Sequence, residues 1–247
     1  NDTVDIISTN PTSSTVYFDN ILGYNNGPYL MNEICKAQYS NATLGVNARS
    51  INLLDMEKQL TAAGIAARNE YNKGSSTYAQ YGTTKTYTSN TKYPSLYANQ
   101  KGAGPNITAA NASTISQPDT TKGNDPYEES KAIATTEPTN DSTYGTEGPL
   151  TVTQTFYCIP IKEANYGDAY KVLNNLTAYW VAARYVDTGS DGADFGLRYA
   201  ATQTDGNCMF RSYSFSGSYD CALRPVVSLP SSLLTGEQTN GAWNLSK

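Results

Sequence analysis

The residues best suited to chemistry gather near the carboxyl end, between positions 185 and 222. Tyr, Ser, Gly, Asp and Asn are frequent there, and binding surfaces favour these types because tyrosine gives a large contact at low entropic cost. If strands in this interval alternate, the side chains can gather on one exposed face. The candidate ligand-binding residues are Tyr185, Asp187, Asp191, Asp194, Tyr199, Asn207, Arg211, Tyr213, Tyr219 and Asp220. The alternative is an ordinary tyrosine-rich sheet edge whose rings pack over a shallow core.

Catalytic chemistry has few candidates. The chain has 247 residues and no histidine, which excludes Ser-His-Asp and Cys-His nucleophiles, histidine zinc sites and a histidine general base. A carboxylate-dependent carbohydrate enzyme needs only two acids. Asp and Glu total 22, but no spacing singles out a pair. We therefore expect no enzyme activity and no cofactor.

Three of the acids, Asp187, Asp191 and Asp194, lie in a glycine-containing turn. Their spacing does not match the twelve-residue calcium loop, and the closing bidentate glutamate is missing. We expect a solvated acidic turn there and no bound metal.

The charge balance restricts the partners. The net charge is −5 and the isoelectric point is near 4.8, so no basic surface is available to neutralise phosphates, and we expect no nucleic-acid partner. The sequence has no run of about 20 apolar residues and no basic-then-apolar leader. We expect no membrane span in this chain.

The four cysteines, Cys35, Cys158, Cys208 and Cys221, form no C-x-x-C pair, so metal-binding and thioredoxin-type motifs are excluded. Cys208 and Cys221 could bridge two neighbouring strands. The alternative is two isolated small side chains, and the sequence leaves the pairing open.

The amino-terminal part predicts a strand at 15–18 followed by two helices. Pro28 follows Asn-Asn-Gly, a pattern typical of the first position of a helix. An apolar stripe of this helix comprises Leu30, Met31, Ile34 and Cys35, and a second helix that begins at Ser50 has a stripe of Ile51, Leu53, Leu54, Met56 and Leu60. Both stripes are expected in the core.

The last hundred residues predict an antiparallel sheet. Runs rich in aromatic and β-branched residues cover 179–186, 193–200, 208–215 and 222–229, at roughly ten-residue spacing. The sheet at 179–229 would carry the candidate face. Arg184, Arg198 and Arg224 recur along its strands, either to contact a ligand carboxylate or to tie loop carbonyls and carboxylates inside the fold, and we expect the second role.

These elements predict one α+β domain over residues 1–247, with two amino-terminal helices packed on a carboxyl-terminal antiparallel sheet. Residues 101–149 are rich in Gly, Pro, Thr, Asn and Ser, with few large apolar groups. This composition predicts a long, irregular, low-complexity loop insertion.

Several runs resemble a large family of surface proteins from gut Firmicutes. They are Tyr179–Arg184, Phe195–Arg198 and Leu223–Leu229, joined by Val4–Ser8, Gly23–Gly27 and Ala48–Asn52. The carboxyl-terminal module is similar to the C-type-lectin fold used by the variable proteins of diversity-generating retroelements. The resemblance implies that an error-prone reverse transcriptase diversifies the segment 185–222.

The expected function is therefore a surface-displayed, adhesin- or receptor-type binding module, located outside the cell or on its surface. Its ligand would be an unidentified protein or glycan on a cell or phage surface. Two alternatives remain open at this point: a structural pilin or surface-layer subunit, in which 185–222 is buried between subunits, and a carboxylate-dependent carbohydrate-active enzyme with two acids in a deep cleft.

Overall fold

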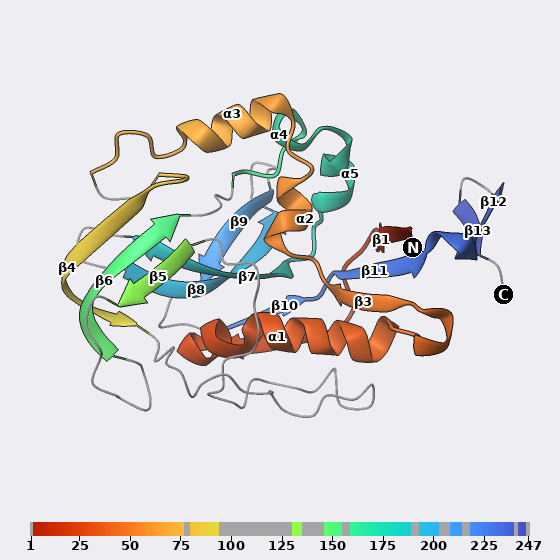
Figure 1. Cartoon of the computed structure of the whole chain (residues 1–247), viewed down its shortest axis with the longest axis horizontal. Helices are drawn as coiled ribbons and strands as arrows, with labels where there is room; N and C mark the ends of the chain where they lie inside the picture. The colour runs from red at the N-terminus through yellow and green to blue at the C-terminus, as the bar shows by residue number, and fades with distance from the viewer. Residues whose placement is uncertain are drawn as a thin grey trace.

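The chain combines helices with antiparallel and mixed sheets, which confirms the α+β class (Figure 1). The computed structural model describes residues 2–76, 80–93, 130–134, 146–154, 159–188, 193–202, 208–213, 218–239 and 242–245. Strands within these ranges form sheets of five, three, three and two strands.

The largest sheet lies at the centre and has the strand order β2-β10-β7-β8-β9. Its strands are β2 (Thr15–Asp19), β7 (Tyr179–Thr188), β8 (Ala193–Thr202), β9 (Cys208–Tyr213) and β10 (Ser218–Ala222). The strands predicted near 15–18, 179–186, 193–200 and 208–215 are confirmed. The sequence did not predict β10, which pairs in parallel with β7 through Ala222 and Tyr179. The sheet is therefore mixed, and the purely antiparallel arrangement that we expected is wrong.

The strand predicted at 222–229 belongs to a different sheet. Strand β11 (Pro225–Pro230) lies between β1 (Thr3–Ile7) and β3 (Asn47–Ser50) and is antiparallel to both. Residues 179–229 thus divide between two sheets. The reason lies in partners that are distant in sequence: Leu223 exchanges hydrogen bonds with Thr12, and the carbonyl of Arg224 accepts from the backbone N–H of Ile51 at 2.9 Å. These bonds direct the chain from one sheet to the other.

The first five residues of β7, Tyr179–Ala183, are buried on both faces of the sheet. Trp180 and Ala182 pack in one core cluster, against α1 (Asn20–Tyr39), whereas Tyr179, Val181 and Ala183 pack in a second cluster on the opposite face. Such continuous burial is typical of a strand between two covering layers. The indole N–H of Trp180 donates to the carbonyl of Val16 at 2.7 Å, so its one polar atom is satisfied inside the core.

Helix α1 begins at Asn20, eight residues earlier than predicted, and Pro28 therefore lies inside the helix and not at its first position. An interior proline removes a helical hydrogen bond, at a cost of about 3 kcal/mol. Burial of the predicted stripe offsets this cost, since Leu30, Met31, Ile34 and Cys35 are at most 1% exposed. At Gly27 the helix lies so close to the sheet that a Cβ atom would be 2.4 Å from Leu197.

The second predicted helix is divided into α2 (Leu53–Glu57) and α3 (Ala62–Glu70). Asn52 and Asp55 form a reciprocal capping box that starts α2. Its predicted stripe is confirmed in the core at Ile51, Leu53 and Met56. The short elements α4 (Glu163–Tyr166), η2 (Gly167–Ala169) and α5 (Tyr170–Leu173) complete this layer, which covers the face of the central sheet opposite α1 (Figure 1).

Two smaller sheets lie at the ends of the molecule (Figure 1). One has the order β4-β6-β5, with β4 (Thr84–Tyr93), β5 (Ser130–Ala134) and β6 (Thr146–Gln154); the other pairs β12 (Leu234–Thr239) with β13 (Ala242–Leu245). Strand β5 and the start of β6 fall inside the predicted insertion 101–149, so that segment is not irregular throughout. Its remaining residues, 101–129 and 135–145, lie outside the described residues. Two further short helical turns are η1 (Ala42–Leu44) and η3 (Ser231–Leu233).

The cysteine pairing is settled at two positions. Cys35 and Cys221 are buried free thiols in the core cluster beneath α1, so the bridge between Cys208 and Cys221 is not formed. Burial raises the pKa of the Cys35 thiol to about 12, and burial together with the charge of Asp220 raises that of Cys221. Both thiols are therefore protonated at neutral pH. Cys158 and the side chain of Cys208 lie outside the described residues.

Arg224 is fully buried and holds two distant segments together. Its guanidinium donates to the carbonyls of Ser8 and Thr9, at 3.0 and 2.9 Å, and to those of Val172 and Leu173. The guanidinium carbon also lies 4.9 Å from the centre of the Tyr179 ring. The expectation that this arginine ties loop carbonyls is confirmed. The side chain of Arg184 lies outside the described residues.

We predict that Arg224→Met lowers the free energy of unfolding by about 3 kcal/mol or more, because each buried carbonyl left without a donor costs about 1–3 kcal/mol. Arg224→Lys should recover only part of this loss, since its donors all lie on one nitrogen atom. Urea denaturation measures both variants. The control is Lys36→Met, which alters an exposed ion pair with Glu33 and should change stability by about 0.5 kcal/mol at most. Equal stability of Arg224→Met and the control would contradict the prediction.

The contact between α3 and α4 gives a second prediction: replacing a helical glycine by alanine should here lower the stability of the protein. Alanine normally stabilises a helix relative to glycine by about 1 kcal/mol. At Gly64, however, a Cβ atom would lie 2.3 Å from the backbone oxygen of Asn165, and that oxygen also accepts from the N–H of Thr61. Gly64→Ala should therefore destabilise the protein in thermal unfolding. The control is the exposed neighbour Ala63, where Ala63→Gly should destabilise the protein through the lower helix propensity of glycine. A higher midpoint temperature of unfolding for Gly64→Ala than for the native chain would contradict the close contact.

Candidate functional site

A cavity lies between β1, α2 and the η2–α5 segment, and we call it the Lys58 cavity. Its volume is about 470 Å³, which falls within the roughly 300–1,000 Å³ of small-ligand pockets. Apolar side chains form its floor: Ile7, Ile51, Val172, Leu173 and Val226. Its rim carries Asp5, Asp55, Lys58 and Asp168. An apolar floor with a few polar groups at the rim is the usual composition of a binding pocket.

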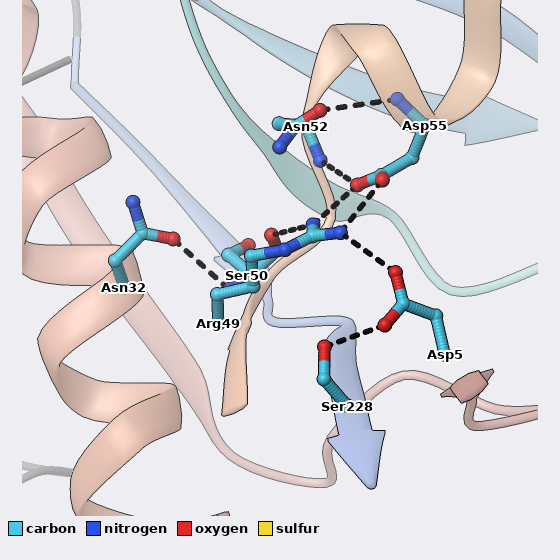
Figure 2. A network of polar contacts seen from close by, with 7 residues as sticks. All are labelled: Asp5, Asn32, Arg49, Ser50, Asn52, Asp55 and Ser228. Atoms are coloured by element: carbon cyan, nitrogen blue, oxygen red, sulfur yellow. Dashed lines mark hydrogen bonds and ion pairs between the residues drawn. The ribbon is translucent and has the colours of Figure 1, made fainter. Parts of the chain in front are cut away.

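Arg49 fixes two of the rim carboxylates (Figure 2). Its guanidinium binds both oxygens of Asp55, at 2.5 and 2.8 Å, and approaches Asp5 at 3.4 Å. The hydroxyl of Ser228 donates to the other oxygen of Asp5 at 2.5 Å. A guanidinium that binds both oxygens of a carboxylate sets its orientation as well as its position. The rim is thus held in one geometry.

Local sequence explains why these groups meet. In the capping box, the backbone N–H of Asn52 donates to Asp55 while the side chain of Asn52 accepts from the backbone of Asp55, so the carboxylate is fixed one turn into α2. The strand register then places Arg49 opposite Val226, and Asp5 opposite Ser228. Cross-strand partners share a face of the sheet, so the arginine and Asp5 lie on the same side. Figure 2 also shows Asn32 of α1, which accepts from the backbone N–H of Ser50 at 3.1 Å.

Lys58 differs from the other charged groups of the rim. Asp5 and Asp55 share Arg49, and Asp168 pairs with Lys171 at 2.7 Å. A hydrogen bond from Lys171, aided by its charge, lowers the pKa of Asp168. Within the described part of the chain, the ammonium group of Lys58 has no ion pair. It is therefore available to a negatively charged ligand group.

The ten residues predicted as a binding face do not gather in this cavity. Tyr199 is only 6% exposed, and its ring packs edge-on against Trp180 with 5.9 Å between the ring centres. Its expected exposure is therefore wrong, because α1 covers this face of the sheet. Asp220 is exposed, as expected.

The strand register divides the remaining positions between two faces. Arg211 is opposite Tyr199, and Tyr213 is opposite Leu197, so these positions belong to the face that α1 covers. Asp187 is opposite Asp194 and Tyr185 is opposite Gly196, one residue out of step with Leu197, so they belong to the other face. A common face for the side chains of these positions stays a prediction. The side chains of Tyr185, Asp187, Asp194, Arg211, Tyr213 and Tyr219, and all of Asp191 and Asn207, lie outside the described residues.

Sequence reasoning missed the rim of the Lys58 cavity. Asp5 and Arg49 occur in two of the runs that carry the family resemblance, Val4–Ser8 and Ala48–Asn52, but nothing in either run shows that they meet. The pattern Asn52-x-x-Asp55 is a recognisable capping box, and it was the one local signal that could have positioned Asp55.

The rim and the floor together define what the Lys58 cavity can hold. Among the described residues, no group of three or more His, Cys, Asp or Glu side chains could hold a metal ion. In the same part of the chain, no helix is long and apolar enough to cross a membrane. The rim offers fixed carboxylates and one available ammonium group above an apolar floor. Such a site can hold an apolar group and orient a charge attached to it.

Comparisons with protein-family models, with curated proteins and with solved structures gave no match to this chain.

Proposed function

We propose that the chain is a ligand-binding module of the adhesin or receptor type, displayed outside the cell, and that the Lys58 cavity is its binding site. One observation carries the proposal: an apolar floor lies beneath a rim whose carboxylates are fixed by Arg49 and whose lysine is available. The preferred ligand group is apolar and bears a negative charge that Lys58 receives. A C-type-lectin-like fold is part of the same proposal and rests on the resemblance of the sequence.

The carbohydrate-enzyme alternative is less well supported. A glycosidase needs one carboxylic acid with a raised pKa to protonate the leaving group. At the Lys58 cavity the pKa of Asp168 is lowered instead, by its hydrogen bond with Lys171, and the other two rim acids are both bound to Arg49. The hydrogen bond from Lys171 favours the charged form of Asp168, which suits binding better than proton donation.

The cavity can be tested with three probes of one shape: 2-naphthoate, 2-naphthylmethanol and 2-naphthylmethylammonium. With methyl-labelled isoleucine, we expect naphthoate to shift the NMR signals of Ile7 and Ile51 and to bind most tightly. Lys58→Gln should reduce its affinity about threefold to tenfold, as expected when one charge contact of about 0.6–1.4 kcal/mol is lost, and should leave the alcohol unaffected.

Lys73→Gln is the matched control, because Lys73 is an exposed lysine that pairs with Glu70 away from the cavity. It should bind all three probes as the native chain does. If none of the probes shifts the Ile7 and Ile51 signals, the Lys58 cavity is not a binding site and the proposal fails.

The proposal also includes retroelement diversification of the segment 185–222, which rests on the resemblance and on the abundance of Tyr, Ser, Asp and Gly there. The expected result is a reverse-transcriptase gene beside this gene, with a near-copy of the coding segment that differs at adenines. Sequencing of the complete genome is the measurement. A genome with no such copy would remove diversification from the proposal and leave binding at the Lys58 cavity unaffected.

A further inference from the structure

We propose that the ligand of this module is an extended peptide strand of another protein, which pairs with the outer edge of β1 and places alternate side chains in two cavities. The inference rests on the proposed function, because one of the two cavities is the Lys58 cavity. It adds the class of the ligand and the way in which the chain recognises it.

In the part of the chain that the structure describes, one edge of strand β1 has no neighbouring strand. Within the described residues it pairs with β11 on one side only, at the end of the sheet β1-β11-β3. Thr3, Asp5 and Ile6 are exposed. Every second residue of an edge strand presents its N–H and C=O groups away from the sheet, which makes such an edge a template for a further strand.

Two cavities flank this edge, one on each face of the sheet. Ile7 is opposite Val226, and both line the Lys58 cavity. Ile6 is opposite Val227, and both line a second cavity of about 260 Å³, which we call the Tyr39 cavity. Neighbouring residues of a strand point to opposite faces, so these two pairs lie on opposite sides. Ile6 and Ile7 line both cavities, so both cavities adjoin β1.

A strand added to β1 would therefore place consecutive side chains in different cavities. Pockets for alternate side chains, together with main-chain hydrogen bonds, are the basis of recognition by strand addition. The larger cavity would receive a large apolar side chain and the smaller one a small apolar side chain. An acidic residue of the peptide would reach Lys58, which lacks an ion pair among the described residues.

The exposed apolar groups support a docked partner. Ile6 is 46% exposed and Tyr39 is 41% exposed, and both line the Tyr39 cavity. Exposed large apolar side chains that gather around a hollow are typical of an interaction site.

Charge favours a foreign strand over a second copy of this chain. Asp5 is the central residue of β1, so antiparallel pairing of two β1 strands about their centres would place one Asp5 opposite the other. Like charges directly opposite each other destabilise a strand pair, and each chain carries a net charge of −5. A partner with apolar residues and an acidic group beside Lys58 avoids this repulsion.

The experiment uses the full chain and a phage-displayed library of linear heptapeptides. Selected peptides are synthesised and then N-methylated at one backbone amide at a time. We expect binding to be lost at every second amide, because only alternate N–H groups of an added strand face β1. Hydrogen exchange should show new protection at residues 3–7.

The protein variants provide a matched pair. Ile6→Arg should weaken the peptides about tenfold or more, because it places a charge at both cavities. Ile65→Arg, at an exposed isoleucine of α3, should leave affinity unchanged. Sedimentation velocity should show that both variants, Ile6→Arg and Ile65→Arg, are monomers.

The remaining outcomes overturn the inference and can be told apart. Peptides that bind without the alternating N-methyl pattern, in a chain that still binds naphthoate, leave the proposed function standing and exclude strand addition. A library that yields no peptide sensitive to Ile6→Arg also excludes it. A dimer that Ile6→Arg dissociates would assign the edge to a second copy. Failure of naphthoate and peptides together removes the proposed function as well.

Discussion

The buried guanidinium of Arg224 holds together two segments that adjoin the Lys58 cavity. Arg224 donates to the carbonyls of Ser8 and Thr9, just after β1, and to those of Val172 and Leu173 in α5. Both segments adjoin the cavity, whose lining includes Ile7 next to the first and Leu173 of the second. None of the described carboxylates pairs with this arginine, so its charge is balanced by carbonyl dipoles and by the face of Tyr179. The spacing of these segments therefore depends on a guanidinium that is not part of the cavity lining.

Only an arginine meets this requirement. A lysine has its donors on one nitrogen atom, whereas the planar guanidinium presents five N–H groups in several directions. An apolar side chain would fill the space but leave the carbonyls without donors in a buried setting, where a missing hydrogen bond is most costly. Tyr179 adds a second bond of the same kind, because its hydroxyl donates to the carbonyl of Leu173 at 2.7 Å. The α5 segment is thus fixed by two side chains: that of Tyr179, at the start of β7, and that of Arg224, directly before β11.

The sequence predicted what depends on local pattern. The strands at 179–186 and 193–200, the buried stripe of α1 and the tying role of Arg224 follow from runs of apolar residues or from the chemistry of one side chain, and all are present. Where prediction failed, a distant partner decided the outcome. Thr12 and Ile51 take the hydrogen bonds of Leu223 and Arg224, and so move β11 to another sheet. Tyr199 was predicted at the surface, but α1 covers its ring.

The candidate site was hidden for the same physical reason. Its floor and rim come from residues 5–7, 51–59, 168–173 and 226, and the spacing within each segment carries no sign of the others. Asp5 and Arg49 are 44 positions apart, and Ser228 lies 223 positions from Asp5. They meet because β11 pairs with both β1 and β3, and that pairing follows from the redirection of the chain at Leu223 and Arg224. Arg224 therefore acts twice. Its side chain holds the segments beside the cavity, and its backbone lies where the chain turns into β11, the strand that brings Asp5, Arg49 and Ser228 together.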